Sequence, residues 1–106
     1  HIISNGLHEV TERKCVLSGT ADYFETITSA DSVGVRKPRP EIFQYSLDLA
    51  KAEKNESIMI GDDWIADVKG AQRFGIDVIF FDVYNDDPQE DNLKVIKYLL
   101  EIKQYL

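Results

Sequence analysis

The fold class of this chain is decided by residues 57–67, which read SIMIGDDWIAD. Residues 57–60 predict a short strand that stops at Gly61 and Asp62. Apolar residues then recur at helical spacing from Ile65 until Gly75, a residue typical of helix ends. A strand that leads directly into a helix is the repeating unit of parallel α/β folds.

The same alternation continues on both sides of this stretch. It predicts a three-layer, Rossmann-like α/β fold, in which helices flank a parallel sheet and the crossovers are right-handed. In the first helix Leu7, Val10, Lys14 and Leu17 recur at the spacing of one helix face. The expected elements are strands at 2–3, 25–29, 57–60 and 76–81, helices at 7–17, 40–50, 65–75 and 93–106, and loops at 30–39 and 82–91.

Composition limits the classes of function. The chain has 106 residues, of which 43% are hydrophobic and 29% charged, so one domain with a sizeable core is expected. A net charge of −7 argues against a nucleic-acid partner, and no apolar run is long enough to cross a bilayer. The single cysteine, Cys15, allows no intrachain disulfide and fits the reducing cytoplasm.

Acidic residues follow the strand at 57–60. Carboxylate oxygens are ligands that Mg²⁺ prefers, and parallel sheets bind ligands beyond the carboxyl ends of their strands. Asp62 and Asp67 are therefore candidate metal ligands, and Asp63 is a further candidate. The alternative is that Asp62 or Asp63 caps the following helix while Asp67 is a solvated surface residue.

Two other strand ends carry residues that suit an anionic ligand. Ser4 and Asn5 offer a hydroxyl, an amide and backbone N–H groups for phosphate, or alternatively an ordinary helix cap. Lys37 precedes Pro38, which restricts it to an extended backbone that can hold an ammonium group in place. The alternative for Lys37 is a solvated basic turn.

Other residues predict structural roles more than chemistry. We expect His8 to be an exposed residue of the first helical turn and Cys15 to be packed. Trp64 is expected to pack at the rim of the site, where a substrate contact is the alternative. The acidic stretch 82–91 lacks the residue order of an EF-hand and is expected to be a solvated loop.

Ser4-Asn5-Gly6, then Lys37-Pro38, then Gly61-Asp62-Asp63 with Asp67 resemble motifs two, three and four of the haloacid dehalogenase-like hydrolases. The resemblance is greatest to the branch with small phosphatases and pyrimidine 5′-nucleotidases. It implies hydrolysis of a small phosphorylated metabolite, for which a nucleoside monophosphate is one candidate, through an aspartyl-phosphate.

The same resemblance implies a role for each motif residue. Asp62 would bind Mg²⁺, and Asp67 would support the metal or its waters. Ser4 and Asn5 would bind the phosphate, and Lys37 would neutralise charge beside the nucleophile and contact the phosphate. These assignments agree with the chemistry, because attack by an anion on a phosphate needs positive charge and fixed donors.

The sequence departs from the family at motif one, the Asp-x-Asp that supplies the nucleophile, since no Asp-x-Asp occurs in the chain. A cap domain between motifs one and two is also absent, and the 33 positions from Ser4 to Lys37 leave no room for a large cap. We therefore expect residues 1–106 to be the C-terminal part of the core domain and inactive alone. Its expected partner is the N-terminal part of the same protein, or another copy, that completes the sheet.

The opening residues and two alternative functions complete these expectations. The chain starts without Met and enters a strand at Ile2, which suggests a cut edge. A receiver-type signalling domain also uses acids, a hydroxyl and a lysine, but there the acidic pair comes first, whereas here the order is Ser4, Lys37, Asp62. A binding or interaction module without catalysis is the other alternative.

Overall fold

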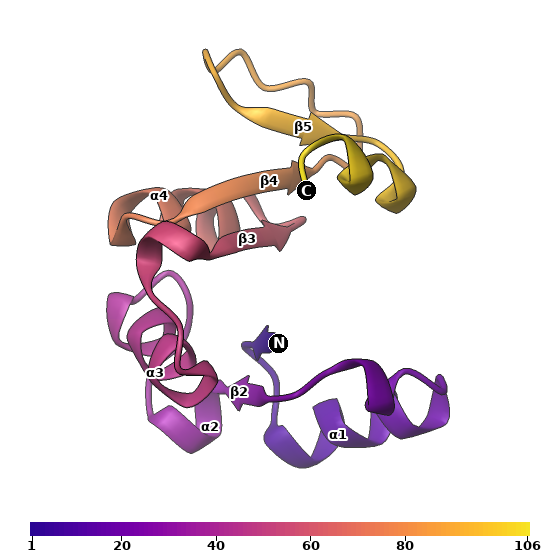
Figure 1. Ribbon diagram of the computed structural model, residues 1–106, viewed down its shortest axis with the longest axis vertical. Coiled ribbons are helices and arrows are strands. Elements are labelled where there is room, and N and C mark those ends of the chain that lie inside the picture. Colours follow the sequence, from indigo (N-terminus) through magenta and orange to yellow (C-terminus); the bar gives the residue numbers. More distant parts are fainter. The chain divides into compact units, whose positions relative to one another are not determined.

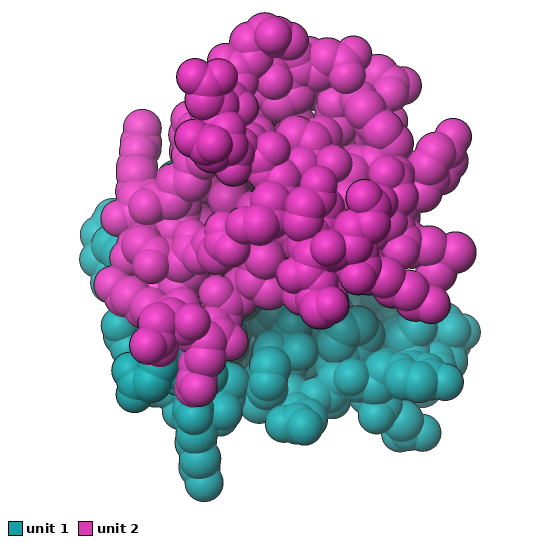
Figure 2. Space-filling view, turned by 45° about the horizontal axis from the view of Figure 1, so that its top comes forward, with its two compact units in different colours: residues 1–53 teal, residues 54–106 magenta.

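The computed structural model describes residues 1–106, which divide into two compact units (Figure 2). Unit 1 comprises His1–Glu53 and unit 2 comprises Lys54–Leu106. Each unit contains its own parallel sheet, with two strands in unit 1 and three in unit 2. The predicted class, an α/β fold with parallel strands and flanking helices, is confirmed.

Unit 1 is built around the parallel pair β1–β2, in which Ser4 pairs with Ser29 at the carboxyl ends of both strands. Helix α1 contacts β2, and α3 contacts both strands (Figure 1). Pro40 occupies the first turn of α3, where its missing N–H costs nothing. The elements are β1 (Ile2–Ser4), α1 (His8–Leu17), η1 (Ala21–Tyr23), β2 (Ile27–Ser29), α2 (Ala30–Val33) and α3 (Pro40–Ala50).

The core of unit 1 comes from α3 and β2 more than from α1. Ile42, Phe43 and Leu47 on α3 are buried, as the spacing of one helix face requires. On α1 only Cys15 is buried, which confirms its expected packing. The helical spacing of Leu7, Val10 and Leu17 does not mark the buried side of α1, because all three side chains are exposed.

Residues 30–33 form helix α2, so the prediction of a loop over the whole of 30–39 is wrong at its start. The helix ends at Gly34, whose φ of 95° lies in the left-handed region that suits glycine. Asp31 on α2 accepts a hydrogen bond from the His8 N–H at 3.0 Å and so caps α1 from another element. His8 is only half-exposed, since its Nδ1 lies 3.0 Å from Ser29 Oγ.

Unit 2 has the strand order β3-β4-β5, and β4 is its central, most buried strand. Val78, Ile79 and Phe80 of β4 form the core together with Val68 and Ile96. Its elements are η2 (Lys54–Glu56), β3 (Ile58–Gly61), the π-helical η3 (Trp64–Lys69), α4 (Gly70–Phe74), β4 (Asp77–Phe81), β5 (Lys94–Ile96) and η4 (Leu99–Gln104).

The predicted final helix over 93–106 is wrong. Residues 94–96 are strand β5, which pairs with β4 through Phe80 opposite Val95, and only η4 is helical, as a 3₁₀ segment. Leu93, Ile96 and Leu100 fit a helical period, but a short apolar run does not distinguish helix from strand. Burial of Ile96 against the β4 ladder decides the outcome. None of the helices in either unit combines the length and the apolar character that crossing a bilayer requires.

Candidate active site

Ser4 is the last residue of β1 and lies at the end of the strand where the sequence predicts a phosphate contact. Its Oγ accepts hydrogen bonds from the Gly6 N–H at 3.0 Å and from the Thr11 hydroxyl at 3.1 Å. The Thr11 hydroxyl also donates to the Leu7 carbonyl at 3.0 Å, so its single proton is shared between these two acceptors. The alternative role of Ser4 as a helix cap is wrong, because the N-cap position of α1 is Leu7.

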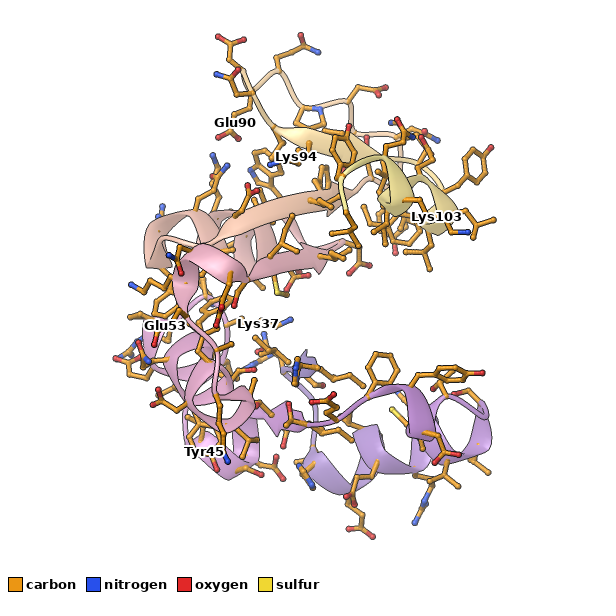
Figure 3. All side chains as sticks on the ribbon, in the orientation of Figure 1. Lys37, Tyr45, Glu53, Glu90, Lys94 and Lys103 are labelled. Carbon is orange, nitrogen blue, oxygen red and sulfur yellow. The ribbon has the colours of Figure 1, made fainter.

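Both polar atoms of the Asn5 side-chain amide form hydrogen bonds with the backbone of one residue, Lys37. Its Oδ1 accepts from the Lys37 N–H at 2.7 Å, and its Nδ2 donates to the Lys37 carbonyl at 3.1 Å. Asn5 therefore fixes the backbone of Lys37, which lies in the loop before α3 (Figure 3). The sequence predicts a phosphate contact for Asn5, but it does not predict that the Asn5 side chain holds the Lys37 backbone in place.

Asp67 is buried, at 4% exposed, so the alternative of a solvated surface residue is wrong. Its Oδ2 accepts a hydrogen bond from the Asp63 N–H at 3.1 Å. A Cβ added at Gly61 would overlap the Asp67 carboxylate, so only glycine lets that carboxylate lie against the end of β3. The absence of a side chain at Gly61 is therefore what allows the Asp67 carboxylate to occupy this position.

The π-helical turn η3 brings Asp67 back toward the strand end. The Asp63 carbonyl accepts from both the Asp67 N–H at 2.9 Å and the Val68 N–H at 3.2 Å. π-helical turns are rare and are often found at functional sites. Here the turn, together with Gly61, places a buried carboxylate five positions beyond Asp62 in the same unit.

The two adjacent acids, Asp62 and Asp63, have different roles in the structure. Asp63 is the N-cap of η3, and its Oδ1 accepts from the Ala66 N–H at 2.7 Å. Asp62 is exposed, and its side chain makes neither a hydrogen bond nor an ion pair. The capping alternative therefore holds for Asp63, and Asp62 remains the acid that is available to a cation.

Trp64 packs within unit 2, as predicted. Its ring meets Phe80 edge-on with 5.3 Å between ring centroids, and Lys69 Nζ lies 4.9 Å from the Trp64 centroid. Lys69 Nζ in turn forms an ion pair with Glu90 Oε2 at 3.0 Å. The loop that carries Glu90 is thereby attached to the helix that follows the acidic motif.

Asp82 is a buried polar residue that sequence reasoning missed, because the stretch 82–91 was expected to be solvated. Its carboxylate accepts from the N–H groups of Asp86 and Asp87, at 2.8 and 2.9 Å, and from Lys97 Nζ at 2.6 Å. Burial alone would raise the pKa of Asp82, but Lys97 and the two N–H groups outweigh burial and hold the pKa below its usual value. The position of Asp82, just after a strand and before a turn, is the only feature of the sequence that could have indicated its role.

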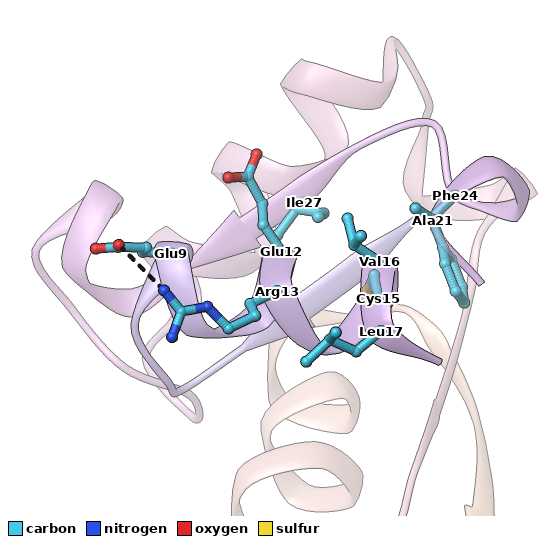
Figure 4. Close-up of a pocket in the computed structure, with 9 residues that line it drawn as sticks. All are labelled: Glu9, Glu12, Arg13, Cys15, Val16, Leu17, Ala21, Phe24 and Ile27. Carbon is cyan, nitrogen blue, oxygen red and sulfur yellow. Dashed lines mark ion pairs between the residues drawn. The ribbon is translucent and has the colours of Figure 1, made fainter. Parts of the chain in front are cut away.

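The cavity found in unit 1 does not coincide with the motif residues. It has a volume of about 590 Å³ and lies along one flank of α1, where Val16, Phe24 and Ile27 line it (Figure 4). Its rim carries an exposed ion pair between Glu9 and Arg13 at 3.8 Å. None of the motif residues Ser4, Asn5, Lys37, Asp62 and Asp67 lines this cavity, so it is not the candidate active site.

The residues of unit 2 fit a magnesium ion that takes few protein ligands. No three side chains from Asp, Glu, His and Cys are grouped as a metal cage. Mg²⁺ usually keeps several waters and binds one or two carboxylates together with a substrate phosphate. Exposed Asp62 and the Gly61-packed Asp67 provide such a pair of hard oxygen ligands.

One family of enzymes matches most of this chain. The family model described as haloacid dehalogenase-like hydrolase matches residues 1–81. The chain belongs to the haloacid dehalogenase-like hydrolases. In this haloacid dehalogenase-like chain, β1 ends at Ser4 and β3 ends at Gly61.

Relatives of this haloacid dehalogenase-like chain include phosphatases. It is 29% identical over 90 residues to the phosphoserine phosphatase of Thermus thermophilus, which covers 83% of this chain and 36% of the relative. It is 28% identical over 90 residues to the pyrimidine 5′-nucleotidase YjjG of Escherichia coli, covering 84% of this chain and 40% of that protein.

A solved structure supports the same fold. The putative hydrolase YfnB from Bacillus subtilis, described as bound to magnesium, superimposes with a TM-score of 0.86 and 25% identity. The match covers 98% of this chain and 46% of the YfnB chain. The chain therefore spans less than half the length of each of these relatives.

Proposed function

We propose that residues 1–106 are the C-terminal part of the core domain of a Mg²⁺-dependent phosphatase that hydrolyses a small phosphorylated metabolite. Support comes from the family, from relatives that are a phosphoserine phosphatase and a pyrimidine 5′-nucleotidase, and from the motif residues. The observation that carries the proposal is the packing of the Asp67 carboxylate on Gly61, directly beside the exposed Asp62. A nucleoside monophosphate is one candidate substrate.

The proposed role of unit 1 is to bind the phosphate. The Ser4 hydroxyl, whose oxygen accepts the Gly6 N–H, would donate its proton to a phosphoryl oxygen. Lys37 supplies positive charge that reduces the repulsion between a carboxylate nucleophile and the phosphate. Asn5 holds the Lys37 backbone so that the ammonium group starts from a fixed position.

The proposed role of unit 2 is to hold the magnesium ion. Asp62 would bind it directly, and Asp67 would bind it or one of its waters; the ion would supply Lewis-acid stabilisation of the phosphoryl charge. The relative YfnB, described as bound to magnesium, supports this assignment. Asp63 is left out of the metal site, since its carboxylate caps η3.

We further propose that the nucleophile, an Asp of an Asp-x-Asp, is supplied by a strand outside residues 1–106. This chain has no Asp-x-Asp, and its strands form two separate parallel sheets, ending at β1 in unit 1 and at β3 in unit 2. In each unit one edge of the end strand, β1 or β3, has no strand partner and is open to a further parallel strand. The N-terminal part of the same protein, or a second copy, is the proposed source, and the isolated chain is expected to be inactive.

Calorimetric titration of residues 1–106 with MgCl₂ and with orthovanadate tests these assignments. Asp62→Asn should abolish Mg²⁺ binding, whereas Asp63→Asn should keep it, because asparagine is an equally good N-cap. Lys37→Met should weaken vanadate binding at least about tenfold and largely spare Mg²⁺ binding. Equal Mg²⁺ affinity in Asp62→Asn would contradict the metal assignment and favour a module without catalysis.

The dependence on an external strand has its own test. The chain alone should show no hydrolysis of p-nitrophenyl phosphate and should self-associate, because unpaired strand edges promote association. Sedimentation velocity and thermal melting report this behaviour. A monodisperse monomer that melts cooperatively, or one that hydrolyses the ester, would overturn the proposed incompleteness.

A further inference from the structure

Strand β2 has one edge that no other strand of unit 1 covers, since β1 is its only partner. The Ile2 N–H donates to the Thr26 carbonyl at 3.0 Å, so Thr26 turns its backbone groups toward β1. Alternate residues of a strand bond to the same neighbour, so Ile27 turns its N–H and its carbonyl to the opposite edge. Unpaired main-chain groups on an edge strand are a template for a further strand, and residues 25–29 contain neither Pro nor Lys to block one.

The side chain of Ile27 points to the face of the sheet that α1 covers. Side chains alternate between the two faces along a strand, so Ile27 and Ser29 share a face. Ser29 Oγ lies 3.0 Å from His8 Nδ1 on α1, which identifies that face. Ile27 is also one of the residues that line the cavity of Figure 4. The unpaired backbone of β2 and the cavity therefore meet at one residue.

Helix α1 supplies the other wall of the cavity from the side nearer β2. His8 of α1 bonds to a side chain on β2, whereas Thr11 bonds to a side chain on β1. Each residue advances an α-helix by about 100°, so Glu12 and Val16 lie about 40° and 80° beyond His8, on the side away from Thr11. Both line the cavity. The cavity therefore lies next to the unpaired edge of β2.

The cavity has an apolar lining and a charged rim. Its volume of about 590 Å³ lies in the range of pockets that enclose a ligand. Glu9 pairs with Arg13 at 3.8 Å, whereas Glu12 has only the Nε2 of His8 at 3.4 Å. The rim thus has one carboxylate without a permanently charged partner. The apolar lining consists of Cys15, Val16, Leu17, Ala21, Phe24 and Ile27.

We propose that the β2 edge and this cavity bind an extended segment of a partner protein, which adds to β2 as an antiparallel strand. The segment residue opposite Ile27 would donate its N–H to the Ile27 carbonyl and accept the Ile27 N–H. Its apolar side chain would enter the cavity. A Lys or Arg two positions away lies on the same face of the segment and would meet Glu12.

Charge favours a basic segment over a second copy of this chain. Two copies paired antiparallel through β2 would form one continuous sheet with both α1 helices on the same face, so their Glu12 carboxylates would repel each other. The unpaired edge of β2 lies opposite the edge of β1 that remains open to a further strand. The inference therefore does not rest on the proposed function.

Fluorescence anisotropy with a fluorescein-labelled peptide, Lys-Thr-Phe-Thr-Lys amide, tests the site. When extended, this peptide places Phe and both Lys on one face. Val16→Asp puts a carboxylate into the apolar cavity at an exposed helix position and should weaken binding at least about tenfold. Val10→Asp makes the same change at an exposed α1 position that does not line the cavity, and should alter the affinity less than about twofold.

The backbone contact is tested on the peptide. Methylation of the Phe amide nitrogen removes the N–H that the Ile27 carbonyl would accept, so binding should weaken at least about fivefold. Methylation of the second Thr nitrogen, which points away from β2, is the matched control and should weaken binding less than about twofold. Equal affinity of the parent and the methyl-Phe peptide would overturn strand addition.

The charge preference is tested by reversal. Glu12→Lys should weaken binding of the Lys peptide at least about threefold and should tighten binding of Glu-Thr-Phe-Thr-Glu amide by a similar factor. Equal affinity of the wild type for the two peptides, or no saturable binding, would overturn the inference. Dimerisation that Val16→Asp abolishes, without peptide binding, would assign the edge to a second copy and also overturn it.

The same titrations separate this inference from the proposed function. Residues 1–106 and the protein extended to include an Asp-x-Asp strand should bind the peptide equally, because that strand is proposed to pair at the other edge of the sheet. Loss of peptide binding in the extended protein would overturn the inference and leave the phosphatase proposal standing. Peptide binding without hydrolysis would do the opposite.

Discussion

Units 1 and 2 each carry candidate site residues, and each unit holds its own residues in place in a different way. In unit 2 the Asp67 carboxylate packs on Gly61 and accepts the Asp63 N–H, and both of these contacts fall within seven residues of chain. In unit 1 Asn5 holds Lys37 across 32 residues through two hydrogen bonds. The local contacts of unit 2 need only the right residues at the right spacing. The hydrogen bonds between Asn5 and Lys37 form only when the whole of unit 1 is folded.

Among the substitutions that test this difference between the units, Gly61→Ala is expected to have the largest effect. The added Cβ overlaps the Asp67 carboxylate, so unit 2 should lose about 3 kcal/mol of unfolding free energy and its Mg²⁺ binding. Urea denaturation and calorimetry measure both. Ile65→Ala, at an exposed position of the same helical turn, is the control and should change neither. Unchanged Mg²⁺ affinity in Gly61→Ala would show that the packing does not hold the metal site.

Asp82→Asn should have a somewhat smaller effect, confined to unit 2. The variant loses the charge that Lys97 pairs with at 2.6 Å, so Tm should fall on the order of 10 °C. Asp86→Asn, where only the backbone N–H binds Asp82, should have little effect. A Tm fall of the same size in both variants would contradict the assignment to the buried carboxylate.

The pH dependence follows from the lowered pKa of Asp82. A carboxyl with a lowered folded pKa contributes stability above its unfolded value, about 3.9, and loses that contribution as pH falls through the folded value. The wild-type chain should therefore lose urea resistance more steeply between about pH 5 and pH 3 than Asp82→Asn does. Parallel curves for the two proteins would assign the acid sensitivity to other carboxyls.

Asn5→Ala should have the smallest effect, in unit 1. Loss of two hydrogen bonds should cost roughly 1.5 kcal/mol and speed hydrogen exchange at the Lys37 amide, while Mg²⁺ binding in unit 2 is unchanged. Asn5→Asp is the matched variant, since it keeps the acceptor for the Lys37 N–H and should protect that amide better than alanine. A change in Mg²⁺ affinity would show that the two halves depend on each other.

Several features could be predicted because they depend on neighbouring residues. The strand before Gly61, the N-cap at Asp63 and the helix that starts at Pro40 follow from local spacing, turn chemistry and the fixed φ of proline. The candidate residues Ser4, Lys37, Asp62 and Asp67 could be proposed from three short motifs in a fixed order.

Features that depend on distant partners could not be predicted. Residues 94–96 form a strand because β4 offers a ladder for them, although their apolar spacing also suits a helix. Asp82 is buried because Lys97 and two backbone N–H groups compensate its charge. The residues next to Asp82 in the sequence do not by themselves predict these hydrogen bonds.

The sequence by itself determined the α/β class, the family and the residues that carry the candidate chemistry, because strand and helix periods and short motifs are local properties. Only the tertiary structure decided that Asn5 holds the Lys37 backbone, that Asp67 is buried on Gly61 and that Val10 and Leu17 of α1 are exposed. Each of these depends on which surfaces meet, and burial or exposure is a property of the folded chain and not of a residue.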